Sequence, residues 1–283
     1  TIRLIKYAIC SFIKLDLNYF KSFKSFNALE ELITKNLEVK DDLKPQFHNE
    51  FNIFESTFLS RPIALRLWSS FFVILPIFVQ APWVRFQPIS ALCATFIILF
   101  VAFVMSRKEI DKWFIVGSLL LGVSGSWLGG CLFWGWLSAY PILHIPVEAV
   151  ALPLAMVGLG TKWKIGSSFY ISSLFGTAIT DITIFLTGIM DQWKEVITAD
   201  SDNAPLILQK TSENLIQFKS LSIIIIAALL LWFISREIFN IAITNSTNGK
   251  ALLVSSYVIQ TTLVVDGIFI FLAIIQPTFS GLV

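Results

Sequence analysis

Seven long apolar segments constrain the fold of this chain more than any other feature of its sequence. A helix that crosses the hydrocarbon layer needs roughly 20 apolar residues, at about 1.5 Å of rise per residue. Candidate segments occupy residues 64–84, 87–106, 114–137, 145–160, 166–190, 220–236 and 251–276. The sequence therefore predicts an all-α, polytopic transmembrane helix bundle over residues 61–283. The fourth segment is short and begins at Pro146, so we expect it to be tilted or partly buried.

The composition excludes other broad classes of protein. Of the 283 residues, 55% are hydrophobic and 14% are charged, whereas a soluble domain carries about a quarter charged residues. A net charge of +2 without a long Lys/Arg run argues against nucleic acid as a partner. Cys10, Cys93 and Cys131 lie far apart and lack paired metal-ligand spacing, so no metal site is predicted.

The first sixty residues have a different composition from the rest. They contain 8 Lys/Arg and 8 Asp/Glu, and apolar residues from Ile2 to Ile13 recur at helical spacing among basic ones. This pattern is typical of an amphipathic helix in the membrane interface. A soluble helix packed on a partner fits equally well. Residues 1–60 are therefore predicted to be a cytoplasmic or interfacial helical extension.

The loop charges predict the orientation of the chain. Positive residues gather in alternate loops, while the segment 191–219 has three Lys against five acidic residues. Because cytoplasmic loops carry an excess of Lys and Arg, the N-terminus is expected in the cytoplasm and the C-terminus on the lumenal or outer side. The positive residues on the expected cytoplasmic side are Arg61, Arg66, Arg107, Lys108, Lys112, Lys162, Lys164, Arg236 and Lys250.

Two residue patterns mark the third segment. Ser118, Gly122, Ser126 and Gly130 recur every four residues, which lets helix backbones approach closely in lipid. A contact within the bundle is the favoured interpretation, and a dimer face is the alternative. The aromatic residues Trp127, Trp134, Trp136 and Tyr140 form either an interfacial belt or the wall of a cavity.

Four ionisable residues stand out at membrane depth: His144, just before the fourth apolar segment, and Glu148, Asp181 and Asp266. Such groups are costly in lipid and are functional candidates by default. Counting residues places Asp181 and Asp266 roughly 14–16 Å from the outer boundary, with Glu148 shallower. We therefore expect the three carboxyl groups to gather in the outer half of the bundle.

Each of the four also has a structural interpretation. Glu148 lies in the first turn of a helix expected to open at Pro146, where acids are favoured by the helix dipole. His144 is either solvated or a ligand of a chlorophyll magnesium. Asp181 can be satisfied by hydrogen bonds between helices. Asp266, with apolar neighbours on both sides, is the hardest to explain by structure alone.

Two kinds of chemistry could use these groups. A carboxylic acid in apolar surroundings can act as a general acid, and aromatic faces can stabilise a cationic isoprenoid intermediate. Alternatively, a series of carboxylates can relay protons or bind cations in a transporter. The glycine pair at 158 and 160 indicates a helix end rather than a phosphate loop.

Most of the chain after residue 60 resembles a cyanobacterial integral-membrane family known only as a domain of unknown function. The likeness lies in residues 79–85 (VQAPWVR), 134–136 (WGW), 144–148 (HIPVE), 173–181 (SLFGTAITD) and 265–269 (VDGIF). The resemblance implies a cyanobacterial source and a photosynthetic, thylakoid membrane, and it supplies no function. Residues 145–148 and 180–181 are also similar to short motifs of membrane carotenoid cyclases and hydratases. Those cyclases tend to have a second acid where this chain has Ala149.

Three functions follow as hypotheses. The first is a non-catalytic accessory or assembly component of the photosynthetic membrane that binds chlorophyll, carotenoid, quinone or lipid, with a photosystem or another large thylakoid complex as partner. His144, Trp134 and Trp136 are its candidate ligand-binding residues. The second is an isoprenoid- or carotenoid-modifying enzyme that uses Glu148, Asp181 or Asp266 as an acid. The third is a proton- or cation-coupled transporter.

Overall fold

The computed structural model of the chain describes residues 63–107, 111–199, 203–245 and 247–275. Within these ranges the ordered elements are helices, and seven are long and apolar enough to cross a membrane. The seven span Ile63–Phe86, Pro88–Met105, Trp113–Leu137, Pro141–Gly158, Lys164–Leu186, Phe218–Thr244 and Gly249–Ile275. The predicted all-α bundle and its number of spans are confirmed. The expected extension over residues 1–60 lies outside the described residues.

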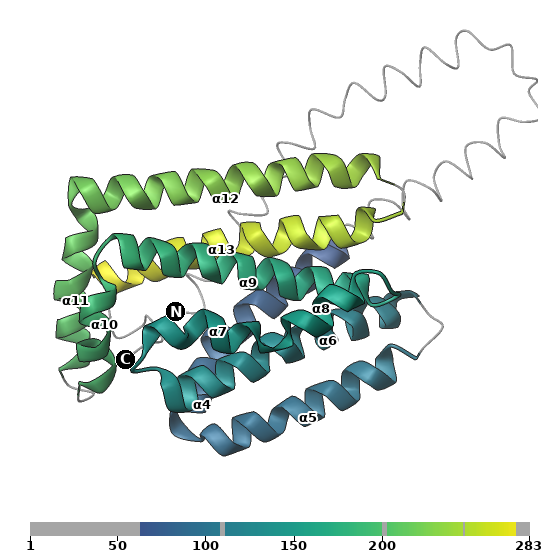
Figure 1. Cartoon of the computed structure of the whole chain (residues 1–283), viewed down its shortest axis with the longest axis horizontal. Helices are drawn as coiled ribbons and strands as arrows, with labels where there is room; N and C mark the ends of the chain where they lie inside the picture. The colour runs from purple at the N-terminus through teal and green to yellow at the C-terminus, as the bar shows by residue number, and fades with distance from the viewer. Residues whose placement is uncertain (1–62, 108–110, 200–202, 246, 276–283) are drawn as a thin grey trace, which may run out of the picture. The chain divides into compact units, whose positions relative to one another are not determined.

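The long helices run side by side (Figure 1). α6 (Asp111–Leu132) packs on α5 (Pro88–Met105) and on α9 (Lys164–Leu186), and α13 (Gly249–Ile275) packs on α9 and on α12 (Phe218–Thr244). The first span passes through a π-helical turn, η3 (Pro76–Gln80), into α4 (Ala81–Phe86). The main core joins this span to α6, α9 and α13 through Phe72, Leu119, Phe169 and Val258.

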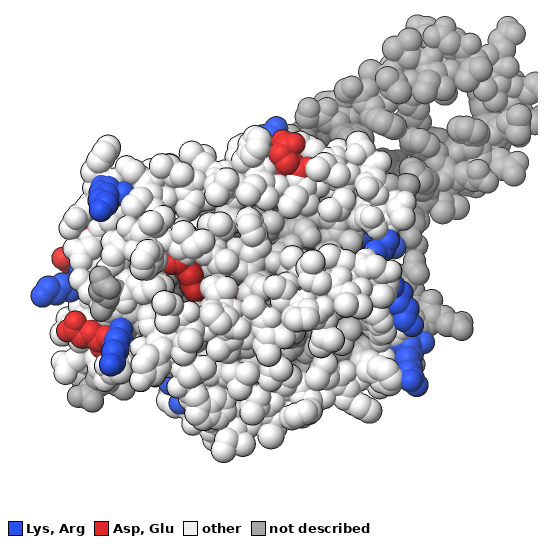
Figure 2. Space-filling model, in the orientation of Figure 1, with Lys and Arg blue, Asp and Glu red and all other residues white. Residues whose placement is uncertain are grey.

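The surface of the bundle is suited to lipid. Apolar side chains on the outside of α5 are largely exposed, including Phe96 at 70% and Phe100 at 68%. Lys, Arg, Asp and Glu gather mainly toward the two ends of the helices, and the band between them is mostly uncharged (Figure 2). Since unpaired charge is expensive in hydrocarbon, this distribution fits an integral membrane protein in contact with lipid.

The small residues of α6 serve contacts inside the bundle. A Cβ atom at Gly122 would lie 2.2 Å from the carbonyl oxygen of Gly166 in α9, so the two backbones touch here. The hydroxyl of Ser118 accepts a 3.0 Å hydrogen bond from the Gly166 amide. Small side chains thus allow α6 and α9 to approach closely, as the four-residue spacing predicts.

The fourth span differs from its prediction. It consists of η5 (Pro141–Leu143), α7 (His144–Glu148), η6 (Ala149–Ala151) and α8 (Leu152–Gly158). Ala155 is buried and several other residues, including His144 and Glu148, are partly buried, which agrees with the expectation of a tilted or partly buried span. Three prolines in 18 residues remove backbone donors, which explains why no continuous helix forms.

The chain turns after α9 earlier than expected. The predicted segment 166–190 runs past the helix, which ends at Leu186, and Gly188 follows with a φ of 76°. Glycine adopts this left-handed conformation without a steric penalty, so it ends the helix. Asp181 is therefore about 8 Å, not about 14 Å, from the end of its span.

Two short helices that the sequence analysis missed lie beyond this turn. α10 (Met190–Thr198) and α11 (Ala204–Glu213) cross the ends of the long helices (Figure 1). A small core of Val196, Leu208 and Ala273 fixes them to α13.

Candidate functional site

His144, Glu148 and Asp181 form one side-chain cluster, here called the His144 cluster. Nδ1 of His144 lies 2.9 and 3.1 Å from the two carboxylate oxygens of Asp181. Nε2 of His144 lies 3.2 Å from Oε1 of Glu148. α7 places His144 and Glu148 one helical turn apart, and α9 supplies Asp181. The three side chains are 16–17% exposed, so they are largely withdrawn from the surroundings.

The contacts of His144 bear on how many protons the cluster holds. Both ring nitrogens face carboxylate oxygens, and each such contact needs a hydrogen between the two heavy atoms. A neutral imidazole carries only one N–H. A protonated imidazole carries two, so it can donate to both carboxylates at once, whereas the neutral ring can donate to only one of them.

Aromatic rings enclose the imidazole. The Phe133 ring stacks on it at a centroid distance of 4.2 Å, and the Trp134 ring meets it edge-on at 6.4 Å. Both rings belong to the π-helical turn η4 (Phe133–Leu137). Trp134, a predicted ligand-binding residue, thus lies at the cluster. Trp136, the second tryptophan predicted to bind a ligand, is 51% exposed and is not part of the His144 cluster.

The break in the fourth span is closed by Tyr170 of α9. Its hydroxyl donates to the carbonyl of Glu148 and accepts a 3.2 Å hydrogen bond from the amide of Ala151. These are backbone groups that a continuous helix would pair internally, and in lipid they need another partner. Tyr170 therefore satisfies two backbone groups that the break would otherwise leave unpaired.

The structural interpretation of Glu148 is wrong. Glu148 is the last residue of α7, not a first-turn residue of a helix opened by Pro146, so the helix dipole does not explain it. Gly129 of α6 permits its position, because a Cβ atom there would lie 2.8 Å from Cα of Glu148. Phe133 and Tyr170 were not identified from the sequence, since nothing in an apolar run distinguishes them from ordinary packing residues.

Asp266 lies next to the cluster but does not join it. Its Oδ2 atom is 2.6 Å from the hydroxyl of Thr180, the residue before Asp181. It lines an apolar cavity of about 170 Å³ between α9, α10, α11, α12 and α13, here called the Asp266 cavity. The structure thus brings two of the three predicted carboxyl groups together on His144 and places the third at a neighbouring cavity.

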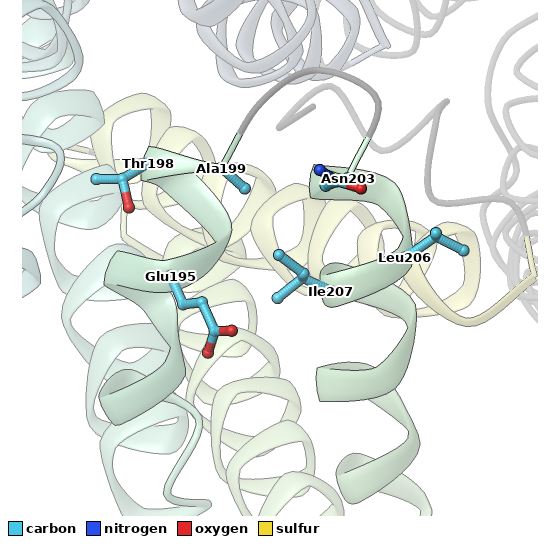
Figure 3. A pocket seen from close by; sticks show the side chains of 6 residues that line it. All are labelled: Glu195, Thr198, Ala199, Asn203, Leu206 and Ile207. Atoms are coloured by element: carbon cyan, nitrogen blue, oxygen red, sulfur yellow. The ribbon is translucent and has the colours of Figure 1, made fainter.

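A second hollow, of about 430 Å³, lies between α10 and α11 (Figure 3). Its lining residues are Glu195, Thr198, Ala199, Asn203, Leu206 and Ile207. Among these described residues Glu195 is the one ionisable group, and the hollow contains no member of the His144 cluster. It is therefore not assigned to the candidate site.

The arrangement bears on metal and pigment binding. In the described part of the chain, no three His, Cys, Asp or Glu side chains are placed to hold a metal ion together. Both ring nitrogens of His144 are engaged by carboxylates, so binding a chlorophyll magnesium requires one of these contacts to open.

Comparison with known proteins identifies the family. A family model described as "Protein of unknown function (DUF3120)" matches residues 69–274, which include the whole cluster and Asp266. The chain belongs to this family. The resemblance to a family of unknown function is thereby confirmed. No curated protein and no solved structure matches the chain, and the likeness to carotenoid cyclases is not shown.

Proposed function

We propose that the His144 cluster is an acid–base centre that acts on a lipid-soluble, isoprenoid-type molecule reaching it from the membrane. The observation that carries this function is an imidazole held between two carboxylates within the apolar layer. The three side chains keep 16–17% of their surface exposed, so the protein does not seal them off completely. A substrate dissolved in lipid could reach them through this opening.

Stability is a poor explanation for the cluster. A buried ion pair often contributes less than well-packed apolar residues of similar volume, because desolvation of the charges offsets their attraction. Three ionisable groups in a bundle that has abundant apolar residues therefore need another reason. Proton exchange supplies one, since an imidazole placed between two carboxylates can hold a second proton.

The two carboxylates have different parts in this chemistry. Asp181 uses both oxygens on Nδ1 of His144 and orients the ring. Glu148 contacts Nε2 through Oε1 only, and its Oε2 has no hydrogen-bond partner among the described residues. Glu148 would deliver the proton to a substrate double bond, and after rearrangement the same carboxylate would take a proton back from a neighbouring carbon. The net reaction is an isomerisation or cyclisation without change of oxidation state.

Lipid analysis tests this function. Extracts of a deletion strain should lack one isoprenoid product and accumulate its precursor, and the complete chain should restore the product. Glu148→Gln keeps the size of the side chain but removes its acid, so it should fail to restore the product. Glu213→Gln, on α11 outside the cluster, is the matched control and should restore it. Identical isoprenoid and lipid profiles in all four strains would exclude the enzyme.

We also propose that the protein lies in the cyanobacterial thylakoid with its N-terminus in the cytoplasm. The sequence resemblance and the loop charges support this location. In intact thylakoid vesicles of a Cys10→Ser chain, a membrane-impermeant maleimide should label Thr161→Cys. It should label Asn203→Cys only after the vesicles are opened. The reverse pattern would contradict the orientation.

A second candidate function is the accessory or assembly role, in which the protein binds pigment, quinone or lipid without chemistry. The Asp266 cavity favours it, because it can hold part of a ligand. An engineered cavity of about 150 Å³ binds benzene, so about 170 Å³ accepts a ring rather than a chlorophyll macrocycle. Native purification should then show the protein migrating with a photosystem or another large complex. Migration as a free protein would count against this role.

A further inference from the structure

The Asp266 cavity has one polar side in an apolar surround. Most of its wall is made of isoleucine, leucine, valine, alanine and aromatic side chains, and Asp266 is the single ionisable residue among the described residues that line it. The polar residues are Asp266, Thr180 and Thr183, with Thr187 directly after α9 and Thr211 and Ser212 of α11. A group that enters the cavity is therefore apolar over most of its surface and polar at one point.

The hydrogen bonds of this polar side show which polar group it can receive. Thr183 donates to the carbonyl of Ile179 at 2.7 Å, and Thr187 donates to carbonyls of its own helix at 3.0 Å. Each hydroxyl has one proton, so both oxygens can only accept a further hydrogen bond. Nε1 of Trp193 is likewise used, because it donates to the carbonyl of Ser138.

Asp266 adds a further acceptor. Its Oδ2 is bound to Thr180, whereas Oδ1 has no hydrogen-bond partner among the residues described. Thr211, also in the lining, has a hydroxyl without a bonded acceptor and can either donate or accept. Because Asp266 lines the cavity, a donor that enters the cavity can form a hydrogen bond with Oδ1.

Gly267 marks the mouth of the cavity. It is the one exposed residue among those lining the cavity, and a Cβ atom built on it meets nothing within 4 Å. It lies within α13, between the ends of a membrane-spanning helix, so the mouth opens toward lipid. A long apolar chain attached to the bound group could leave the cavity there.

We propose that the Asp266 cavity binds a ring-sized apolar group that carries a hydroxyl, with the hydroxyl donating to Oδ1 of Asp266 and the remainder of the molecule leaving past Gly267. A quinol and a ring alcohol of an isoprenoid share this chemistry. Binding here does not require the His144 cluster to be catalytic, so either function above can fail while this site remains.

Matched probes test the site in the purified full chain in detergent. Decylbenzoquinol and decylbenzoquinone have the same skeleton, but only the quinol donates hydrogen bonds. The quinol should bind at least tenfold more tightly, about the contribution of one hydrogen bond to a charged acceptor. 4-Decylcyclohexanol represents the isoprenoid alcohol. Preferential binding of either hydroxyl probe supports the site, and the probe that binds more tightly identifies the ligand as a quinol or as an isoprenoid alcohol. Equal or tighter binding of the quinone, or tightest binding of decylamine, would overturn it.

Two variants locate the binding. Gly267→Leu should block both hydroxyl probes while leaving the thermal unfolding midpoint unchanged or higher, because the new side chain enters open space and glycine is a poor helix former. Gly160→Leu, where the nearest atom is 3.8 Å from the added Cβ, is the matched control and should bind normally. Asp266→Leu should reduce quinol affinity to that of the quinone. Unchanged quinol binding in both cavity variants would refute the location.

Discussion

Removing His144 alone should destabilise the protein far more than removing the whole cluster. His144→Leu leaves the carboxylates of Glu148 and Asp181, each only 16–17% exposed, without their shared positive partner. Breaking a buried ion pair in this way costs about 3–5 kcal/mol. The triple variant His144→Leu/Glu148→Met/Asp181→Leu replaces every charge with an apolar side chain, and should range from neutral to about 4 kcal/mol more stable than the parent.

Unfolding of the full chain in bicelles, followed by circular dichroism during titration with a denaturing detergent, measures both effects. Relative to the parent, the single variant should unfold at a lower concentration of denaturing detergent. The triple variant should unfold at the same concentration as the parent or at a higher one. If the triple variant is as unstable as the single one, the cluster is a structural element and the stability argument for its function is incorrect. If His144→Leu is as stable as the parent, the two contacts of His144 do not form.

The same unfolding assay tests two packing features. Tyr170→Phe removes the hydroxyl that closes the helix break and should cost about 1–3 kcal/mol for each backbone group left unpaired, while Tyr140→Phe, at an exposed site, should have little effect. Gly122→Ala places a methyl group 2.2 Å from the carbonyl oxygen of Gly166, so it should destabilise the bundle. Gly160→Ala should not destabilise it, because the nearest atom is 3.8 Å from the added methyl group. Equal destabilisation by the two substitutions would contradict the close contact between α6 and α9.

The number of spans could be predicted because lipid imposes it. An apolar run must be long enough to cross the hydrocarbon layer, and this requirement is local in sequence. The seven observed spans accordingly coincide with the seven predicted ones, with differences mainly at their ends. The helix pair α10–α11 was missed because its few apolar contacts are made with α13, which is distant in sequence.

The site was predictable in its residues but not in its geometry. Ionisable side chains in apolar runs stand out by their cost, so His144, Glu148, Asp181 and Asp266 could be selected from the sequence. Which of them meet depends on how each helix is rotated about its axis. That rotation is set by packing such as the close approach of α6 to α7 and α9, which results from contacts among residues far apart in the chain.

The protonation of His144 tests the central claim most directly. The chain has two histidines, so a His48→Gln chain labelled with ¹⁵N-histidine contains His144 as its one labelled ring. Solid-state NMR of this chain in lipid bilayers should show both ring nitrogens protonated, each in a hydrogen bond to a carboxylate. Asp181→Asn should change the Nδ1 resonance, and Glu148→Gln the Nε2 resonance. A ring with one unprotonated nitrogen that is insensitive to both substitutions would contradict the proposed acid–base centre.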